Sequence, residues 1–175
     1  MRNYFLGLCL LFALCFTACS HSDDSVDVLI IGGGASGVTA GIQSARMGAA
    51  TLIVEETEWL GGMLTSAGVS AVDGNYDLPA GLFGEFREHL ADYYGGLDSL
   101  KTGWVSAVLF EPSVGNKIFH EMVDAEKNLK VWHNATLVKL EREKDVWIAQ
   151  IQMKDNTIKK IHAKILIDGT ELGDI

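Results

Sequence analysis

The sequence predicts an α/β fold that combines a parallel sheet with an antiparallel β-meander. Residues 26–31 form an apolar run rich in valine and isoleucine, which is typical of a buried parallel strand. Small residues at three- and four-residue intervals follow, as expected for a helix packed closely on a sheet. Residues 50–54 form a second apolar run, and the alternation along residues 146–153 indicates the meander. The first three segments have the order of a βαβ unit.

The turn after the first strand carries a glycine motif. Gly32, Gly34 and Gly37 match G-x-G-x-x-G at the point where the strand should lead into the helix. Gly32 permits a tight turn, Gly34 lets the backbone approach a pyrophosphate, and Gly37 lets the helix lie close to the strand. The N–H groups at the start of the helix then point toward the phosphates. This motif predicts a Rossmann-like FAD/NAD(P)-binding domain.

An acidic residue stands at the end of the second strand. Glu55 follows Gly37 by 18 residues, close to the interval of roughly 20 residues expected for the acid that binds ribose hydroxyls. A carboxylate at this position accepts hydrogen bonds from both hydroxyls and repels a 2′-phosphate, so FAD or NAD is favoured over NADP. The alternative interpretation is a plain βαβ unit that holds no nucleotide.

The remaining elements follow from periodicity. Apolar residues at helical spacing predict helices over residues 79–94 and 113–127. Strands are expected over residues 130–133, 135–140, 146–153 and 157–167. Turn residues at 143–145 and 155–156 separate the strands of the meander.

Residues 1–18 have the architecture of a secretory signal, with Arg2 followed by an apolar core and small residues. The core is shorter than the ~20 residues that a membrane-spanning helix needs. Phe16-Thr17-Ala18-Cys19 resembles the lipobox of bacterial lipoproteins, which makes Cys19 the expected lipidation site. Residues 19–25 would then be a tether and residues 26–175 the folded domain.

The expected location is therefore outside the cytoplasm, in the periplasm or on the outer membrane through the lipid anchor. An ordinary cleaved signal with a free periplasmic product is the alternative. The formal net charge of −9 argues against a nucleic-acid partner.

All three cysteines, Cys9, Cys15 and Cys19, lie within or at the edge of the signal. The mature domain therefore has no disulfide, redox dithiol or iron–sulfur ligand, which excludes disulfide-reductase chemistry for this chain. The five histidines show no metal-ligand spacing, and no metal site is expected.

Four segments together resemble a known family. The glycine motif with Ala35 and Ser36, then Glu55, Leu60-Gly61-Gly62-Met63 and residues 168–174 resemble the N-terminal part of FAD-dependent oxidoreductases with a glutathione-reductase-like FAD domain. The resemblance implies a meander inserted before the last parallel strand. It also implies that residues 168–174 (Asp-Gly-Thr-Glu-Leu-Gly-Asp) form a second dinucleotide motif.

The same resemblance implies roles for further residues. Gly61, Gly62 and Met63 would line the flavin side of the cofactor, and the following Thr65 and Ser66 belong to the same loop. Segment 136–138 would contact adenine through Leu137 and Val138, and Gly169 would approach the cofactor through its backbone.

The expected function is that of a flavoprotein oxidoreductase with FAD as cofactor, whose flavin takes a hydride from an unidentified small organic substrate. No catalytic acid or base can be named, although Asp73, Tyr76 and His89 are present. The family's substrate domain and last FAD-contacting segment have no counterpart in the sequence, so we expect a truncated FAD-binding domain with apolar surface left uncovered. An NAD-binding module or dehydrogenase, and a non-catalytic remnant of an exported flavoprotein, are the alternatives.

Overall fold

A computed structural model describes residues 24–74 and 76–175. The expected signal, the lipidation site Cys19 and most of the expected tether lie outside the described residues. The first strand begins at Asp24, so it takes in Asp24 and Ser25, which the sequence analysis assigned to the tether.

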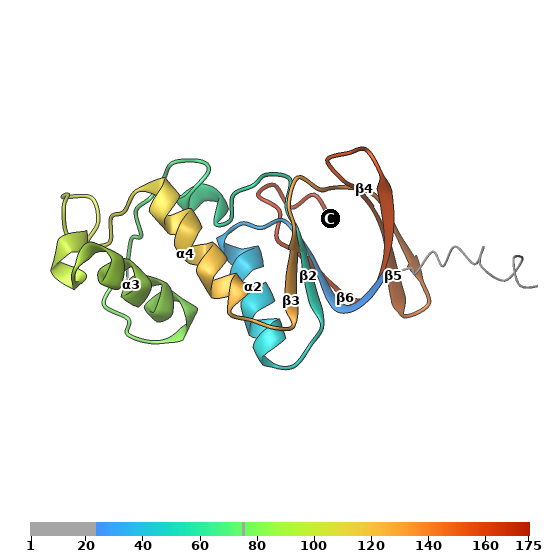
Figure 1. Ribbon diagram of the computed structural model, residues 1–175, viewed down its shortest axis with the longest axis horizontal. Coiled ribbons are helices and arrows are strands. Elements are labelled where there is room, and N and C mark those ends of the chain that lie inside the picture. The colour runs from blue at the N-terminus through green and yellow to red at the C-terminus, as the bar shows by residue number, and fades with distance from the viewer. Residues whose placement is uncertain (1–23, 75) are drawn as a thin grey trace, which may run out of the picture.

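Among the described residues, six strands form one sheet in the order β3-β2-β1-β6-β5-β4 (Figure 1). The strands are β1 (Asp24–Ile31), β2 (Thr51–Val54), β3 (Leu129–Trp132), β4 (Thr136–Glu143), β5 (Val146–Gln152) and β6 (Ile158–Asp168). The first three and β6 run parallel, whereas β4, β5 and β6 pair antiparallel as the expected meander. The mixed α/β fold with an inserted meander is confirmed.

Strand β6 belongs to both parts of the sheet. Its first half pairs with β5, and residues from Asp24 to Ile31 of β1 pair with the stretch from Ile161 to Asp168. Because β5 pairs only as far as Ala163, the outer edge of β6 beyond that residue has no strand partner among the described residues. One continuous strand thus carries the chain from the meander to the carboxyl edge of the parallel sheet.

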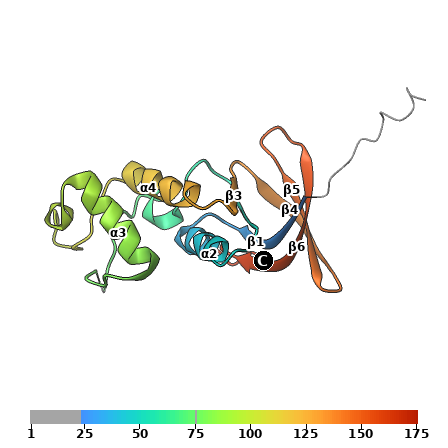
Figure 2. The same ribbon diagram turned by 60° about the horizontal axis from the view of Figure 1, so that its bottom comes forward.

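In the part of the chain that the structure describes, three α-helices lie to one side of the parallel strands (Figure 2). They are α2 (Ala35–Arg46), α3 (Gly81–Tyr94) and α4 (Pro112–Asp124), with short 3₁₀ turns η2 (Gly62–Leu64) and η3 (Leu97–Leu100). The small face of α2 lets it approach the sheet closely: a Cβ on Gly41 would lie 2.6 Å from Cδ1 of Ile53. Arg46 forms salt bridges to Glu85 at 2.8 Å and to Glu126 at 2.7 Å, which join α2 to α3 and to the turn after α4.

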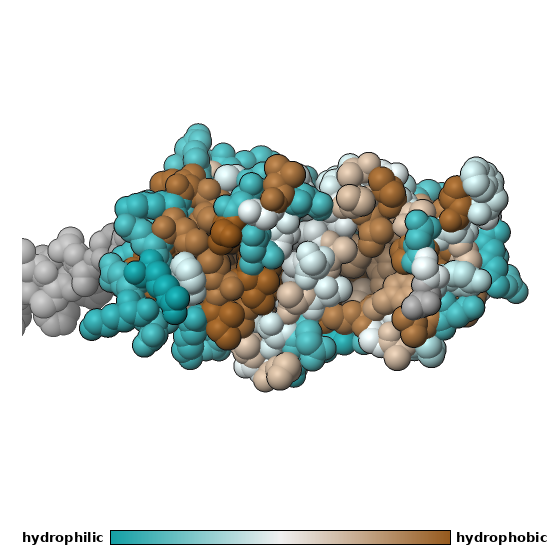
Figure 3. Space-filling view, turned by 180° about the vertical axis from the view of Figure 1, so that it is seen from behind, coloured by the Kyte–Doolittle hydropathy of each residue, from teal (hydrophilic) through white to brown (hydrophobic). Residues whose placement is uncertain are grey.

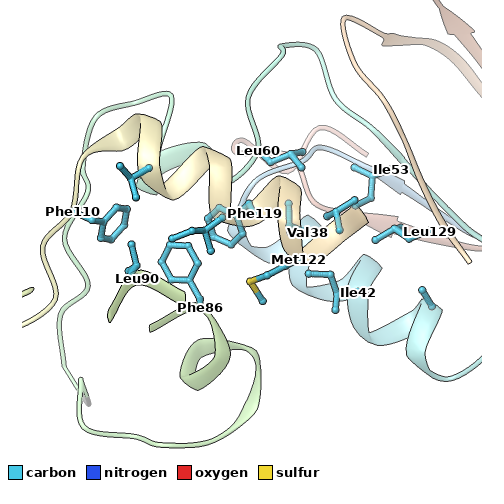
Figure 4. Close-up of a cluster of buried hydrophobic side chains, with 14 of the residues drawn as sticks. Val38, Ile42, Ile53, Leu60, Phe86, Leu90, Phe110, Phe119, Met122 and Leu129 are labelled. Atoms are coloured by element: carbon cyan, nitrogen blue, oxygen red, sulfur yellow. The ribbon is translucent and has the colours of Figure 1, made fainter. Parts of the chain in front are cut away.

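Each face of the parallel sheet is covered by a separate apolar cluster. Val38, Ile42 and Met122 of the helices pack with Ile53 and Leu129 on one face (Figure 4). On the opposite face, alternate residues of β1 and β2 pack against the meander. Burial on both faces explains why residues 28–31 of β1 and 52–54 of β2 are apolar without alternation.

Apolar side chains also reach the surface. Seen from behind, they gather in a patch on the half of the molecule nearer the meander (Figure 3). Ile165 is 54% exposed and Leu172 is 86% exposed. Within residues 24–74 and 76–175, no helix has the length and apolar character needed to cross a membrane.

Candidate functional site

A cavity of about 510 Å³ opens at the carboxyl ends of the parallel strands. Eight of the residues singled out in the sequence line it: Gly32, Gly34, Glu55, Gly62, Met63, Ser66, Leu137 and Gly169. The chain leaves β1 toward β2 on one side, while β6 lies on the other side of β1. Ligands of open α/β sheets bind at such a switch point, outside the carboxyl ends of the strands.

The glycine bend after β1 is held by backbone contacts on both sides. Gly32 has φ +98° and donates its N–H to the carbonyl of Val54 at 2.8 Å. A side chain on Gly32 would overlap the carbonyl of Gly169, the first residue after β6. Gly169 in turn donates its N–H to Ile31 at 2.8 Å. The bend is therefore fixed between the ends of β2 and β6.

Helix α2 begins directly after this bend. Gly34 is its N-cap residue with extended backbone (φ −63°, ψ 178°) and provides no side-chain cap, and the first turn contains no acidic residue. The first N–H groups of the helix, in the turn that begins with Ala35 and Ser36, are therefore available to an anion. Gly37 is buried beneath the bend, where a Cβ would overlap the carbonyl of Gly32.

Glu55 lines the cavity directly beside the glycine bend. Gly33 donates its N–H to Oε2 of Glu55 at 2.7 Å, and the N–H and hydroxyl of Thr57 each donate to Oε1 at 2.8 Å. The Thr57 hydroxyl has an alternative acceptor in the carbonyl of Trp59, at 3.1 Å. A ribose hydroxyl can therefore replace it on Glu55 without leaving a donor unsatisfied.

The second glycine pair meets the first motif in space. Gly61 donates its N–H to Gly33 at 2.8 Å and forms a bridge with Gly34. It has φ +104° and lies on Phe119, whose Cε2 would be 2.5 Å from a Cβ at that position. Helix α4 also fixes this segment, because Asn116 accepts the N–H of Leu60 at 2.8 Å.

In the loop after Gly61 and Gly62, some side chains line the cavity and one is buried in the protein. Met63 is 56% exposed and lines the cavity together with Ser66. Thr65, by contrast, is buried and donates its hydroxyl to Leu60 at 2.6 Å. The role of Thr65 is therefore to fix the loop, whereas Ser66 reaches the cavity.

The two residues expected at adenine are placed differently. Leu137 lines the cavity and is partly buried against the meander cluster. Val138 is 47% exposed and does not line this cavity. The strand pairing of β4 with β5 shifts register between Leu137 and Lys139, which places Val138 at an irregularity.

The loop after β6 is organised by Asp168. Thr170 donates its hydroxyl and its N–H to Asp168 Oδ1 at 2.7 and 3.0 Å, and these bonds hold the pKa of Asp168 below its ordinary value. The Thr170 hydroxyl accepts the N–H of Asp174 at 2.9 Å. These contacts fix the backbone that carries Gly169 and Glu171.

Three residues at the cavity were missed in the sequence. Gly33, which lies between the first two glycines of the motif, donates its N–H to Glu55. Thr57 holds the same carboxylate, and Glu171 lines the cavity from the loop after β6. The spacing of Glu171 within Asp-Gly-Thr-Glu was visible, but the direction of its side chain depends on tertiary packing.

Asp73, Tyr76 and His89, whose presence was noted in the sequence without a role, do not line this cavity. Asp73 and Tyr76 line a separate pocket of about 370 Å³ with Trp104, and His89 is an exposed residue of α3. Within the described ranges, no group of three or more His, Cys, Asp or Glu side chains could hold a metal ion.

The cavity fits an adenine dinucleotide. It combines three features: the start of α2 has no side-chain cap, any side chain at the glycines would fill the bend, and the carboxylate of Glu55 lies beside the bend. The backbone supplies the donors that phosphate needs, and Glu55 supplies the acceptor that ribose needs.

Comparisons with known proteins agree with this geometry. The family model described as FAD dependent oxidoreductase matches residues 27–175. A search of curated proteins found no match.

Many solved structures share the fold. The myxobacterial chondrochloren halogenase CndH, described as a variant of FAD-dependent halogenases, matches with TM-score 0.61 and 12% identity over 84% of this chain and 37% of its own. A flavoprotein/dehydrogenase from Cytophaga hutchinsonii matches with TM-score 0.53 and 18% identity over 86% of this chain and 40% of its own. The geranylgeranyl bacteriochlorophyll reductase-like protein of Thermoplasma acidophilum gives TM-score 0.54 and 19% identity, over 83% of this chain and 39% of its own. This chain thus spans less than half the length of each of these proteins.

Proposed function

The chain belongs to the FAD dependent oxidoreductase family, and we propose that the cavity binds the adenosine and diphosphate of FAD in an enzyme that oxidises a small organic substrate. The observation that carries this proposal is the 2.7 Å contact between the Gly33 N–H and Glu55. It holds the glycine bend proposed for the pyrophosphate and the acid proposed for the ribose directly against each other at the edge of one cavity.

Each part of the cofactor has a matching part of the site. The first N–H groups of α2 and the bare backbone at Gly34 face the diphosphate, and Glu55 accepts hydrogen bonds from the adenosine ribose. Leu137 offers an apolar wall to adenine. The segment with Gly62, Met63 and Ser66, which also lines the cavity, would hold the flavin side of the cofactor.

The redox chemistry belongs to the cofactor. When bound, FAD supplies a two-electron acceptor that takes a hydride from an organic substrate. The protein residues hold and orient the dinucleotide, and the carboxylate of Glu55 discriminates against a 2′-phosphate by charge.

Glu55→Ala tests the assignment. We expect the dissociation constant for FAD to rise by about ten-fold or more, because hydrogen bonds to a charged group contribute on the order of 1.5–3 kcal/mol. Titration of FAD into purified protein, followed by flavin fluorescence, measures this change. Thermal unfolding of the variant shows whether the turn around Gly33 still folds.

Glu56→Ala is the matched control. Glu56 is the next residue in the chain and also lines the cavity, but it is not the residue proposed to bind the ribose. It should leave FAD affinity nearly unchanged. Equal FAD affinities for wild type and Glu55→Ala would contradict the role given to Glu55.

We also propose that the protein is exported and anchored to the membrane through a lipid on Cys19. The apolar core, the small residues before Cys19 and the polar residues after it support this proposal. Cell fractionation of wild type and Cys19→Ser tests it. We expect the wild type in the membrane fraction and the variant, which has no lipid anchor, outside it. Equal membrane attachment of both proteins would contradict the proposal.

A further inference from the structure

The carboxylate of Glu171 lies between the two glycine segments of the cavity. A Cβ built on Gly62 would overlap Oε1 of Glu171, and a Cβ on Gly34 would lie 3.2 Å from the same oxygen. Oε1 of Glu171 therefore lies next to both glycines, in space that is open because glycine has no side chain.

This position coincides with the start of α2. Gly34 caps the helix without a side-chain acceptor, and no acidic residue occupies the first turn. The partial positive charge of a helix start favours an anion. Glu171 thus brings a negative charge from the loop after β6 to the place where the proposed function puts the diphosphate.

The side chain can leave this place without rearranging its loop. Thr170 donates to the carboxylate of Asp168, and Asp174 donates its N–H to the hydroxyl of Thr170. These bonds hold the backbone on both sides of Glu171. Glu171 itself is an exposed residue, so rotation of its side chain moves the carboxylate into solvent.

We propose that Glu171 is a built-in competitor of the cofactor diphosphate. Its carboxylate occupies the phosphate position in the ligand-free protein and must swing out when FAD enters, because two negative groups at this distance repel each other. This inference rests on the proposed function. It assigns Glu171 a role opposite to that of Glu55: removal of its charge tightens the binding of diphosphate ligands.

The experiment compares wild type, Glu171→Gln and Glu56→Gln by titration calorimetry with FAD, ADP and adenosine. Glu171→Gln keeps the size of the side chain and removes its charge. We expect it to bind FAD and ADP about ten-fold more tightly than wild type, equivalent to about 1.4 kcal/mol. Its affinity for adenosine, which has no phosphate, should not change.

Glu56→Gln removes the same charge from another part of the cavity wall. It should shift the FAD and ADP affinities much less than Glu171→Gln does, which separates a local competitor from a general charge effect. Equal shifts for the two variants would overturn the inference.

The remaining outcomes separate this inference from the proposed function. FAD binding by wild type with unchanged or weaker binding of FAD and ADP by Glu171→Gln overturns the competitor role and leaves the proposed function intact. Binding of FAD by Glu171→Gln alone supports both. Absence of FAD and ADP binding in all three proteins rejects both.

Discussion

Gly34→Val is expected to abolish measurable FAD binding while the chain remains folded. In the ligand-free protein a Cβ at Gly34 meets only Oε1 of Glu171 at 3.2 Å and the carbonyl of Gly169 at 3.6 Å, and the backbone has a φ that valine accepts. The same side chain would fill the space through which the diphosphate reaches the start of α2. We expect affinity to fall by at least about 100-fold, which corresponds to about 2.7 kcal/mol.

Ala80→Val is a matched control, because Ala80 is the N-cap residue of α3 and also has extended backbone. It introduces the same branched side chain at a helix start that faces no proposed ligand. FAD titration and thermal unfolding should show an unchanged affinity for Ala80→Val and a similar melting temperature for both variants. Retention of FAD binding by folded Gly34→Val would show that the diphosphate lies elsewhere.

Gly37→Ala is expected to destabilise the fold itself. A Cβ on Gly37 would overlap the carbonyl of Gly32. This carbonyl cannot move easily, because the hydrogen bond from Gly32 to Val54 and the one from Gly169 to Ile31 fix both sides of the bend. Alanine is worth about 1 kcal/mol more than glycine inside a helix, but the overlap opposes this gain. We expect a net loss of about 3 kcal/mol in the free energy of unfolding, as for severe overpacking.

Gly41→Ala provides the comparison within the same helix. Its Cβ would meet Cδ1 of Ile53 at 2.6 Å, and that atom is the far end of a flexible side chain. Chemical denaturation should therefore show a cost well below that of Gly37→Ala. A Gly37→Ala protein that unfolds at the same denaturant concentration as wild type would mean that α2 does not rest on the bend.

The parts of the site that are local in sequence could be predicted from the sequence. The strand, the glycine bend and the helix are adjacent along the chain, and Glu55 ends a strand whose parallel pairing with β1 fixes its distance from the bend. A buried parallel pair leaves little freedom in register, because a slip would turn apolar side chains away from their cluster.

The parts that depend on contacts between distant loops could not be predicted in this way. Val138 and Leu137 are neighbours in β4, but only the observed register irregularity decides which of them faces the cavity. Thr65 is a small polar residue in a glycine-rich loop, and its burial follows from the packing of that loop on α4. The position of the Glu171 carboxylate likewise requires three loops to meet, and no local pattern encodes it.

In the proposed function, the glycine bend and Glu55 together hold the adenosine and diphosphate of FAD. Titration of the purified wild-type protein with FAD, with ADP and NADP⁺ as competitors, tests it most directly. We expect saturable, stoichiometric FAD binding that ADP displaces and that NADP⁺ does not, because its 2′-phosphate would be repelled by Glu55. Folded protein that binds no FAD, or that prefers NADP⁺, would contradict it.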